Sequence, residues 1–485
     1  MAAVQWLSPR ACQKGYSRSV RELVRRSPNF ISAWLLAGFV LRLLFFVAAP
    51  QITDDSRIYS DIARNWLQHG VYGISTSGGI LPTYIRLPGY PGFLALLFAV
   101  FGDHNFRAVM VWQVFIDLGT CLLIADLAGR VAGPRAAKVS FALAALCPFL
   151  ANYASAVLTE TLEVFFTALA LDLAVIGFDG FSEHRFRAWI GCGLAIAACI
   201  YMRPDGGLLL PTIGLYLLYL LFRRAPARDA ASNVSTGTLL WASFLVVVFS
   251  LVPLVPWTVR NWRTMHVFEP LTPRYANEPG EFVPTGFNRW VKTWIADYAS
   301  VEEIYWQEPG AKIDASLLPA RAFDSAEQKA QTQEILDRYN ETTDIDPDLD
   351  REFELLAEQR IHRHWVRYYV WLPAVRIADM WLRPRTELLP ADSRWWEFNE
   401  DAKWLAVSVG LGVINFAYIL LGAIGLWRAR RVSGFPMLLL FLLIRSVFLG
   451  TLENPEPRYT LECYPVVIVL AAMAMVRCTR VATKI

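Results

Sequence analysis

Apolar residues along this chain come in blocks that are much longer than the core helices of a water-soluble protein require. A helix that crosses the roughly 30 Å hydrocarbon core of a bilayer needs about 20 consecutive apolar residues. Runs near that length lie at 31–50, 106–128, 138–155, 160–178, 204–222, 238–258 and 404–427, with shorter candidates at 188–202, 435–450 and 463–477. The pattern predicts an all-α polytopic membrane protein with about ten transmembrane helices, in a range of about nine to twelve.

One apolar segment, "PGYPGFLALLFAVFG" at 88–102, is too short to cross and follows two prolines, so we expect an interfacial or re-entrant helix there. If this segment does not cross, the basic loops all fall on one side of the membrane, which the positive-inside rule assigns to the cytoplasm. Besides the N-terminus, these loops carry Arg130, Arg135, Lys138, Arg185, Arg187, Arg223, Arg224, Arg228, Arg428, Arg430, Arg431, Arg477, Arg480 and Lys484. Both termini are therefore predicted to be cytoplasmic.

The remaining polar segments divide the chain into four parts. We expect a cytoplasmic basic N-terminus at 1–30, a transmembrane module at 31–258 that includes a first external loop at 51–105, a periplasmic or lumenal region at 259–403, and C-terminal transmembrane helices at 404–485. The region at 259–403 is predicted to be mixed in structure. Its aromatic and basic stretch "HRHWVRYYVWLPAVRIADMW" has the amphipathic spacing of a helix lying in the membrane interface.

Composition and charge exclude several classes of function. The chain is 55% hydrophobic and 18% charged. Its net charge is only +3 and its basic residues cluster in short loops, which argues for membrane orientation rather than nucleic-acid binding. The seven cysteines form no CxxC pair, so neither a disulfide framework nor a zinc site is indicated. No Walker loop, GxGxxG or GxSxG motif occurs, and the six histidines show no metal-ligand spacing.

Five charged residues fall within predicted spans: Arg42, Asp117, Asp126, Asp172 and Arg445. Charges inside a bilayer are expensive, so each should pair with another or face a polar cavity. We expect Arg42 to pair with Asp117. A proton path is the alternative reading of this set.

Two adjacent carboxylates, Asp54 and Asp55, stand where the chain leaves its first span. A carboxylate at this depth can reach a lipid phosphate in the headgroup layer. Transfer from such a phosphate needs a base for the acceptor's proton and positive charge for the phosphate that leaves. The alternative is that either residue caps a helix that begins at Arg57.

Six motifs then carry a resemblance. "DDSRIYSDIARN", "IRLPGYPGFLALLFAVFG", "LTETLEVFFTALAL", "YMRPDGGLLLP", "PWTVRNW" and "EPRYTLECYP" occur in the order seen in the glycosyltransferase C superfamily. More narrowly, the chain resembles the bacterial family 39 branch, which is similar to protein mannosyltransferases and to the lipid A aminoarabinose transferase. The likeness runs from about residue 31 to 477. It implies transfer of a sugar from a polyprenyl-monophosphate donor on the outer or lumenal face.

The resemblance implies a catalytic base in the first motif. The family pattern is an Asp followed four residues later by a Tyr, and Asp55 with Tyr59 fits it. Asp54 then has a supporting or capping role. Ser56 stands where the family often has a second acidic residue, which weakens the case for a metal site built from that pair.

Further site residues follow from the other motifs. Arg86 occupies the position that the family associates with the lipid phosphate, and the planar guanidinium suits phosphate oxygens; its alternative is an interfacial anchor. Tyr84 could add a hydroxyl donor. Glu160 matches a second acidic residue that faces the cavity in relatives, where it could hold the sugar, the acceptor or a metal; its alternative is a favourable charge at a helix N-terminus.

Three arginines complete the predicted outer-face cations: Arg203, Arg260 and Arg458. A monophosphate needs only one or two of them, so the others should pair with Asp205, Glu453 or Glu456. Arg260 and Arg458 are the preferred donor contacts, and Tyr459 beside Arg458 could contact substrate or pack.

The sequence thus predicts an inverting glycosyltransferase with Asp55 as general base and Glu160 as a second catalytic residue. Predicted partners are a polyprenyl-phosphate sugar, a protein, lipid or glycan acceptor, and the bilayer, with no nucleic acid. No protein metal ligands are assigned, and the need for a divalent cation is left open. The expected location is a bacterial inner membrane with the site facing the periplasm. The alternatives are a multispan transporter or flippase of lipid-linked substrates, a polymerase or ligase using lipid-diphosphate donors, and a non-catalytic scaffold.

Overall fold

The computed structural model describes residues 24–178, 185–222, 236–397, 401–429 and 434–476. Most of the predicted cytoplasmic N-terminus and the basic residues Arg223, Arg224, Arg228, Arg430, Arg431, Arg477, Arg480 and Lys484 lie outside these ranges. Within them the chain is almost entirely helical, and a two-stranded hairpin is the one sheet that the described residues form.

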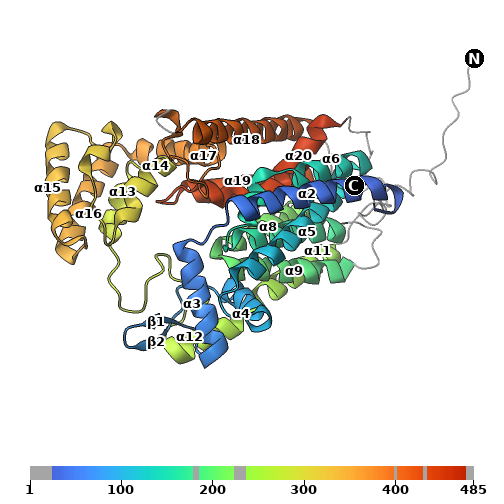
Figure 1. The fold of residues 1–485 in the computed structure, drawn as a ribbon, viewed down its shortest axis with the longest axis horizontal. Helices are drawn as coiled ribbons and strands as arrows, with labels where there is room; N and C mark the ends of the chain where they lie inside the picture. The colour runs from blue at the N-terminus through green and yellow to red at the C-terminus, as the bar shows by residue number, and fades with distance from the viewer. Residues whose placement is uncertain (1–23, 179–184, 223–235, 398–400, 430–433, 477–485) are drawn as a thin grey trace, which may run out of the picture.

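The long apolar runs form a bundle of helices that lie roughly side by side (Figure 1). The pairs α18 and α20, α8 and α9, and α5 and α8 pack along their lengths. The bundle consists of α2 (Pro28–Ala48), α5 (Phe106–Ala132), α6 (Pro134–Ala145), α7 (Pro148–Tyr153), α8 (Glu160–Phe178), α9 (Arg185–Met202), α10 (Leu209–Phe222), α11 (Thr236–Leu251), α18 (Ala402–Ala429), α19 (Phe435–Gly450) and α20 (Tyr464–Met475).

The helix lengths are those of a multi-pass membrane protein. Seven segments in the described ranges are long and apolar enough to cross: Pro28–Ala48, Phe106–Ala132, Glu160–Phe178, Pro204–Phe222, Thr236–Met265, Ala402–Ala429 and Pro457–Met475. Three further apolar helices are shorter: Gly89–Phe101, Phe186–Met202 and Phe435–Gly450. The predicted fold class is confirmed.

The predicted span at 138–155 contains a break between two helices. The run at 138–155 is divided between α6, which ends at Ala145, and the six-residue α7, which begins at Pro148. Proline has no backbone N–H to donate to the preceding turn, and its ring clashes with the carbonyl four residues earlier, so an apolar run that contains it can break into two helices. The chain then continues through 154–159 to the start of α8.

The first external loop folds against one end of the bundle (Figure 1). It contains α3 (Asp54–His69), the antiparallel strands β1 (Gly73–Thr76) and β2 (Gly79–Pro82), and α4 (Gly89–Phe101). With 13 residues, α4 is about 20 Å long, which is too short for a span, and it packs against α3. Helix α12 (Val255–Met265) lies at the same end of the bundle (Figure 1). It extends past the domain boundary predicted between residues 258 and 259.

The region after α12 forms a lobe beyond the same end of the bundle (Figure 1). Its helices are α13 (Thr285–Lys292), α14 (Tyr298–Glu303), α15 (Ala326–Thr342), α16 (Pro347–Arg363) and α17 (Leu372–Leu382). Helices α13 to α16 enclose their own apolar core, which includes Trp290, Trp294 and Phe353. Trp365, Tyr369 and Trp371, just before α17, are more than 60% exposed, as a helix lying in the membrane interface would require.

The intramembrane charges are paired. The Arg42 Nε atom donates to Asp117 Oδ2 at 2.7 Å, and both side chains are almost fully buried, so the predicted pair is confirmed. Arg42 also donates to the backbone carbonyls of Gly38 and Ala145. Arg445 pairs with Asp205 and Glu462 near the end of the bundle that faces the lobe.

Candidate active site

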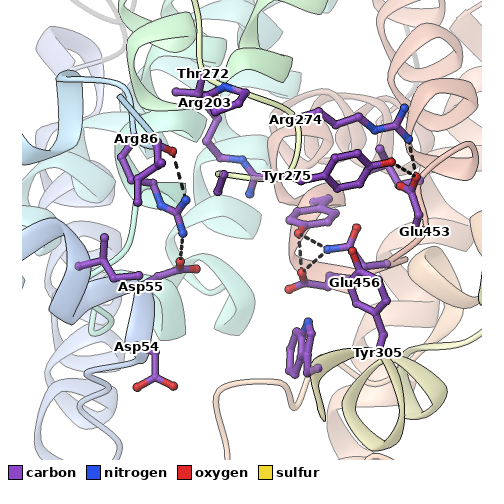
Figure 2. Close-up of a pocket in the computed structure, with 18 of the residues that line it drawn as sticks. Asp54, Asp55, Arg86, Arg203, Thr272, Arg274, Tyr275, Tyr305, Glu453 and Glu456 are labelled. Atoms are coloured by element: carbon purple, nitrogen blue, oxygen red, sulfur yellow. Dashed lines mark hydrogen bonds and ion pairs between the residues drawn. The ribbon is translucent and has the colours of Figure 1, made fainter. Parts of the chain in front are cut away.

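A cavity of about 1320 Å³ lies between the bundle and the lobe. Its bundle side is formed by the start of α3, the segments 85–87, 158–160 and 202–205, and the turn at 456–459. Its lobe side is formed by the irregular segment 272–284, parts of α13 and α14, and residues 451–454. Figure 2 shows these two sides facing each other across the opening.

Asp55 is held at the cavity by the way α3 begins. Thr53 is the N-cap: its Oγ1 accepts from the Ser56 N–H at 3.4 Å, and the Ser56 Oγ accepts from the Thr53 N–H at 3.0 Å. This reciprocal arrangement is a capping box. The helix therefore begins at Asp54, and the alternative that Asp54 or Asp55 caps a helix starting at Arg57 is wrong.

Two guanidinium groups from distant parts of the chain hold the Asp55 carboxylate. Arg86 Nη2 lies 2.9 Å from Asp55 Oδ1, and Arg458 Nη1 lies 3.4 Å from Asp55 Oδ2. Burial raises the pKa of this carboxyl, but the charges of Arg458 and Arg86 outweigh burial and lower the pKa below its ordinary value. Asp55 is thus ionised at neutral pH and lies beside two cations.

Asp54 differs from its neighbour. Its side chain is 92% exposed, points away from Arg86 in Figure 2, and pairs only with Arg57 at 3.0 Å among the described residues. It stands at the rim of the cavity.

Glu160 begins α8 and is 1% exposed. Its Oε1 lies 3.7 Å from both Arg203 Nη1 and Arg458 Nη1. Arg458 thus bridges Asp55 and Glu160. The other oxygen, Glu160 Oε2, is shielded from solvent and accepts no hydrogen bond from the part of the chain that the structure describes.

Arg203 is fixed by a network that reaches into the bundle. Its Nε lies 3.2 Å from Asp205 Oδ1, which is the pair expected from the sequence, and its guanidinium lies over the Tyr459 ring at 4.3 Å. Arg445 supports the network from below, because it contacts Asp205 at 2.9 Å and donates to the Tyr459 carbonyl. Arg445 was predicted only as an intramembrane charge.

The two tyrosines of the predicted site pack beneath the cations. Tyr59 lies under Arg86, with 5.7 Å between the guanidinium carbon and the ring centroid, and burial raises the pKa of its phenol to about 12. Tyr459 donates its hydroxyl to Glu456, which in turn holds Arg458 Nε at 2.5 Å. Both rings border the cavity.

Two predicted contact residues lie outside the cavity lining. Arg260 donates to the backbone carbonyls of Tyr72 and Thr83, each at 2.6 Å, and so ties α12 to the hairpin. Tyr84 is buried in a small apolar cluster with Trp257 and Leu87. The structure therefore brings Asp55, Tyr59, Arg86, Glu160, Arg203, Arg458 and Tyr459 together at one cavity, with Asp54 at its rim.

The polar region after residue 259 was predicted to cover the cavity, but the individual residues on this lobe side were not. Arg274 and Tyr275 both contact Glu453, and Tyr305 lies on the same side (Figure 2). Lys292 and Glu308 also line the cavity. Burial, with Asp344 and Asp350 nearby, raises the pKa of Glu308 to about 7. The one signal for this side lay in "TLENPEP", whose two glutamates precede Arg458.

The described residues hold no group of three or more His, Cys, Asp or Glu side chains arranged for a metal ion. The oxygens of Asp55 and the Oε1 atom of Glu160 face guanidinium groups, which occupy the places that a divalent cation would need. The acid set therefore does not fit a divalent cation in this arrangement.

A comparison with known protein families matches part of the chain. Residues 86–257, about a third of the chain, match the family described as dolichyl-phosphate-mannose-protein mannosyltransferase. No curated protein sequence matches the chain significantly.

Solved structures share the fold. The oligosaccharyltransferase AglB of Archaeoglobus fulgidus, in complex with an inhibitory peptide and a dolichol-phosphate, aligns over 92% of this chain with 13% identity and a TM-score of 0.52. The same enzyme tethered to an acceptor peptide gives 12% identity over 91% of this chain and a TM-score of 0.50. The alignments cover 50% and 49% of AglB, so this chain spans about half its length. ArnT of Cupriavidus metallidurans, bound to undecaprenyl phosphate, aligns over 93% of this chain and 78% of its own, with 16% identity and a TM-score of 0.41.

Proposed function

The chain belongs to the glycosyltransferase C superfamily, and on that premise we propose that it transfers a sugar from a polyprenyl-monophosphate donor to an acceptor. The observation that carries this proposal is the Asp55 carboxylate held between Arg86 and Arg458 at the cavity. The carboxylate can accept a proton, and the two guanidinium groups can bind a phosphate. All three meet at an end of the bundle, where lipid headgroups would lie.

The proposed reaction follows from these contacts. The donor phosphate binds Arg86 and Arg458, with Arg203 beside them. The acceptor atom attacks the anomeric carbon from the opposite face while Asp55 removes its proton. The new bond to the anomeric carbon forms as the bond to the phosphate oxygen breaks, and the electron pair stays on the phosphate. The guanidinium groups stabilise that charge, and the configuration at the anomeric carbon inverts.

The phosphate would also change the state of the base. In the structure, Arg458 and Arg86 lower the Asp55 pKa, which makes the carboxylate a weak base. A bound phosphate neutralises these cations and competes with Asp55 for their N–H groups. The carboxylate is then freed, and its pKa rises as the donor binds.

We propose that the cavity faces the periplasm or another external space. Arg130, Arg187 and Arg428 lie at the ends of α5, α9 and α18 that are remote from the lobe (Figure 1). The positive-inside rule assigns those ends to the cytoplasm, which places the cavity on the other side.

The test measures sugar transfer from a panel of polyprenyl-monophosphate donors by wild-type protein, Asp55→Asn and Asp54→Asn. Loss of a general base lowers turnover by roughly 10² to 10⁴-fold. We expect that loss in Asp55→Asn, with donor binding retained, and near wild-type turnover in the exposed control Asp54→Asn. Full activity of Asp55→Asn, or no transfer by wild type from any donor, would overturn the proposal.

A further inference from the structure

The lobe side of the cavity is rich in carboxylates. Glu302 and Glu308 lie at and after α14. Among the described residues, neither of these two forms an ion pair with Arg or Lys, whereas Glu453 pairs with Arg274 and Glu456 with Arg458. Two carboxylates thus remain without a cationic partner on the side opposite the proposed phosphate site.

Aromatic rings stand among these carboxylates. Tyr275, Tyr305 and Trp306 line the same side, and Tyr298 packs edge-on against Trp306 with 5.6 Å between the ring centroids. A cation is attracted to the face of an aromatic ring as well as to a carboxylate. Rings and carboxylates on one side therefore suit a ligand that carries ammonium or guanidinium groups.

Two buried carboxylate oxygens lack a partner at this cavity. Glu160 Oε2, on a side chain that is 1% exposed, and Glu387 Oε2 are both shielded from solvent and accept no hydrogen bond from any described residue. Buried polar atoms are normally hydrogen-bonded, and leaving one unsatisfied is unfavourable. Both residues line the cavity, so a ligand that donates hydrogen bonds would satisfy them.

The net charge of the lobe also favours a cationic ligand. Between residues 266 and 397 the sequence has 24 Asp and Glu against 15 Lys and Arg, although the whole chain has a net charge of +3. A region of this charge attracts cations over roughly the Debye length and repels anions. The anionic donor is therefore drawn to the arginines of the bundle side, and a cationic acceptor to the lobe.

We propose that the lobe side of the cavity is an acceptor subsite for a basic polypeptide segment, whose Lys or Arg side chains flank the residue that receives the sugar. The proposal rests on the proposed function, since it names the acceptor of that reaction. A polypeptide is favoured over a small molecule because Tyr275, Glu302 and Glu308 come from separate segments of the lobe and can contact several side chains of one ligand.

The test is equilibrium binding of fluorescein-labelled nine-residue peptides to the full chain in nanodiscs of phosphatidylcholine, which carries no net charge. Each peptide has one central Ser, flanked by Lys, by Ala or by Glu. The buffer is at pH 8, where Glu308 is ionised because its pKa is about 7. We expect the Lys peptide to bind at least ~10-fold more tightly than the Ala peptide at low salt, the Glu peptide to bind most weakly, and the difference to shrink as salt is added.

Matched variants locate the effect. Glu302→Gln with Glu308→Gln removes two carboxylates from the cavity, and Glu341→Gln with Asp348→Asn removes two from exposed positions of the lobe outside it. We expect the first pair to reduce the preference for the Lys peptide to within ~3-fold and the second to leave it unchanged. Equal binding of the Lys and Ala peptides by wild type, or an equal loss in both double variants, would overturn the proposal.

Peptide binding requires neither donor nor turnover, so its outcome is separate from that of the transfer assay. A Lys preference that depends on Glu302 and Glu308 supports the subsite even if no donor is used. Transfer to a lipid or glycan acceptor without any peptide preference would support the proposed function and overturn the subsite.

Discussion

At the scale of single residues, the proposed base is controlled by the cations that would bind the donor. Arg86 and Arg458 hold Asp55 ionised, and a phosphate between them would relieve that effect. One pair of arginines would thus serve the leaving group and also switch the base on when the donor arrives.

The pH dependence of transfer tests this coupling. The acid limb of the kcat/KM profile reports the pKa of the base in the free enzyme. The acid limb of the kcat profile reports the pKa of the base in the enzyme–substrate complex. With Asp55 as the proposed base, activity should fall as pH drops through the pKa of its carboxyl. The pKa of Asp55 is lowered in the free protein, so we expect the acid limb of kcat/KM at a pH below the ordinary Asp pKa of about 3.9. We expect the acid limb of kcat at a higher pH. Arg86→Gln should move the kcat/KM limb upward. Coincident limbs in wild type would contradict the coupling.

The Arg42–Asp117 pair supports a second residue-scale prediction. Both side chains are buried within the bundle, and removal of one partner leaves the other charge unpaired. Arg42→Met should destabilise the protein by about 3 to 5 kcal/mol, and adding Asp117→Leu should recover most of that loss. Thermal unfolding in detergent measures both. A double variant no more stable than the single one would show that the pair is not the cause.

At the scale of elements, the packing of α18 against α20 depends on close backbone approach. A Cβ added at Gly425 would overlap the Leu470 carbonyl of α20, whereas one added at Gly410, also in α18, meets nothing within 4 Å. Gly425→Ala should therefore destabilise the bundle by about 1 to 3 kcal/mol, and Gly410→Ala should not. Unfolding temperatures of the two variants provide the comparison, and equal stability would contradict the packing argument.

Hydropathy predicted the long apolar helices, which must be long enough to cross a bilayer. Most long apolar runs are helices within a few residues of their predicted bounds, because a bilayer leaves the backbone no other way to satisfy its hydrogen bonds. The break at Pro148 was missed, since 138–155 remains apolar throughout and hydropathy is insensitive to a missing N–H. The hairpin at 73–82 was also missed, because its four-residue strands carry little alternation.

Site residues were predictable where a motif carried them. Asp55, Arg86, Glu160, Arg203 and Arg458 meet at one cavity although they come from five segments of the chain. Arg260, also in a motif, instead supports the hairpin, because its contacts are to backbone carbonyls that no motif specifies. The lobe side had no comparable signal, since its residues reach the cavity only through the tertiary fold.

At the scale of the whole molecule, the two ends of the bundle carry different charges and should face different compartments. Asp348→Cys in the lobe should react with a membrane-impermeant maleimide on intact cells, and Arg135→Cys, after α5, only once the membrane is permeabilised. The background is low because the described cysteines are all buried, and Cys12 and Cys478, which lie outside the described ranges, can be replaced by Ser. Labelling of both sites from outside would contradict the assigned sidedness.

The position of Arg458 has a consequence for biosynthesis. It lies 403 residues beyond Asp55 and at the start of the last candidate span, and it is the contact that joins Asp55 to Glu160. A nascent chain therefore has its proposed base and its first proposed phosphate ligand in the membrane long before the second ligand is synthesised. The complete site forms only when α20 inserts beside α18, so an unfinished chain would be unable to discharge the lipid-linked sugars that surround it.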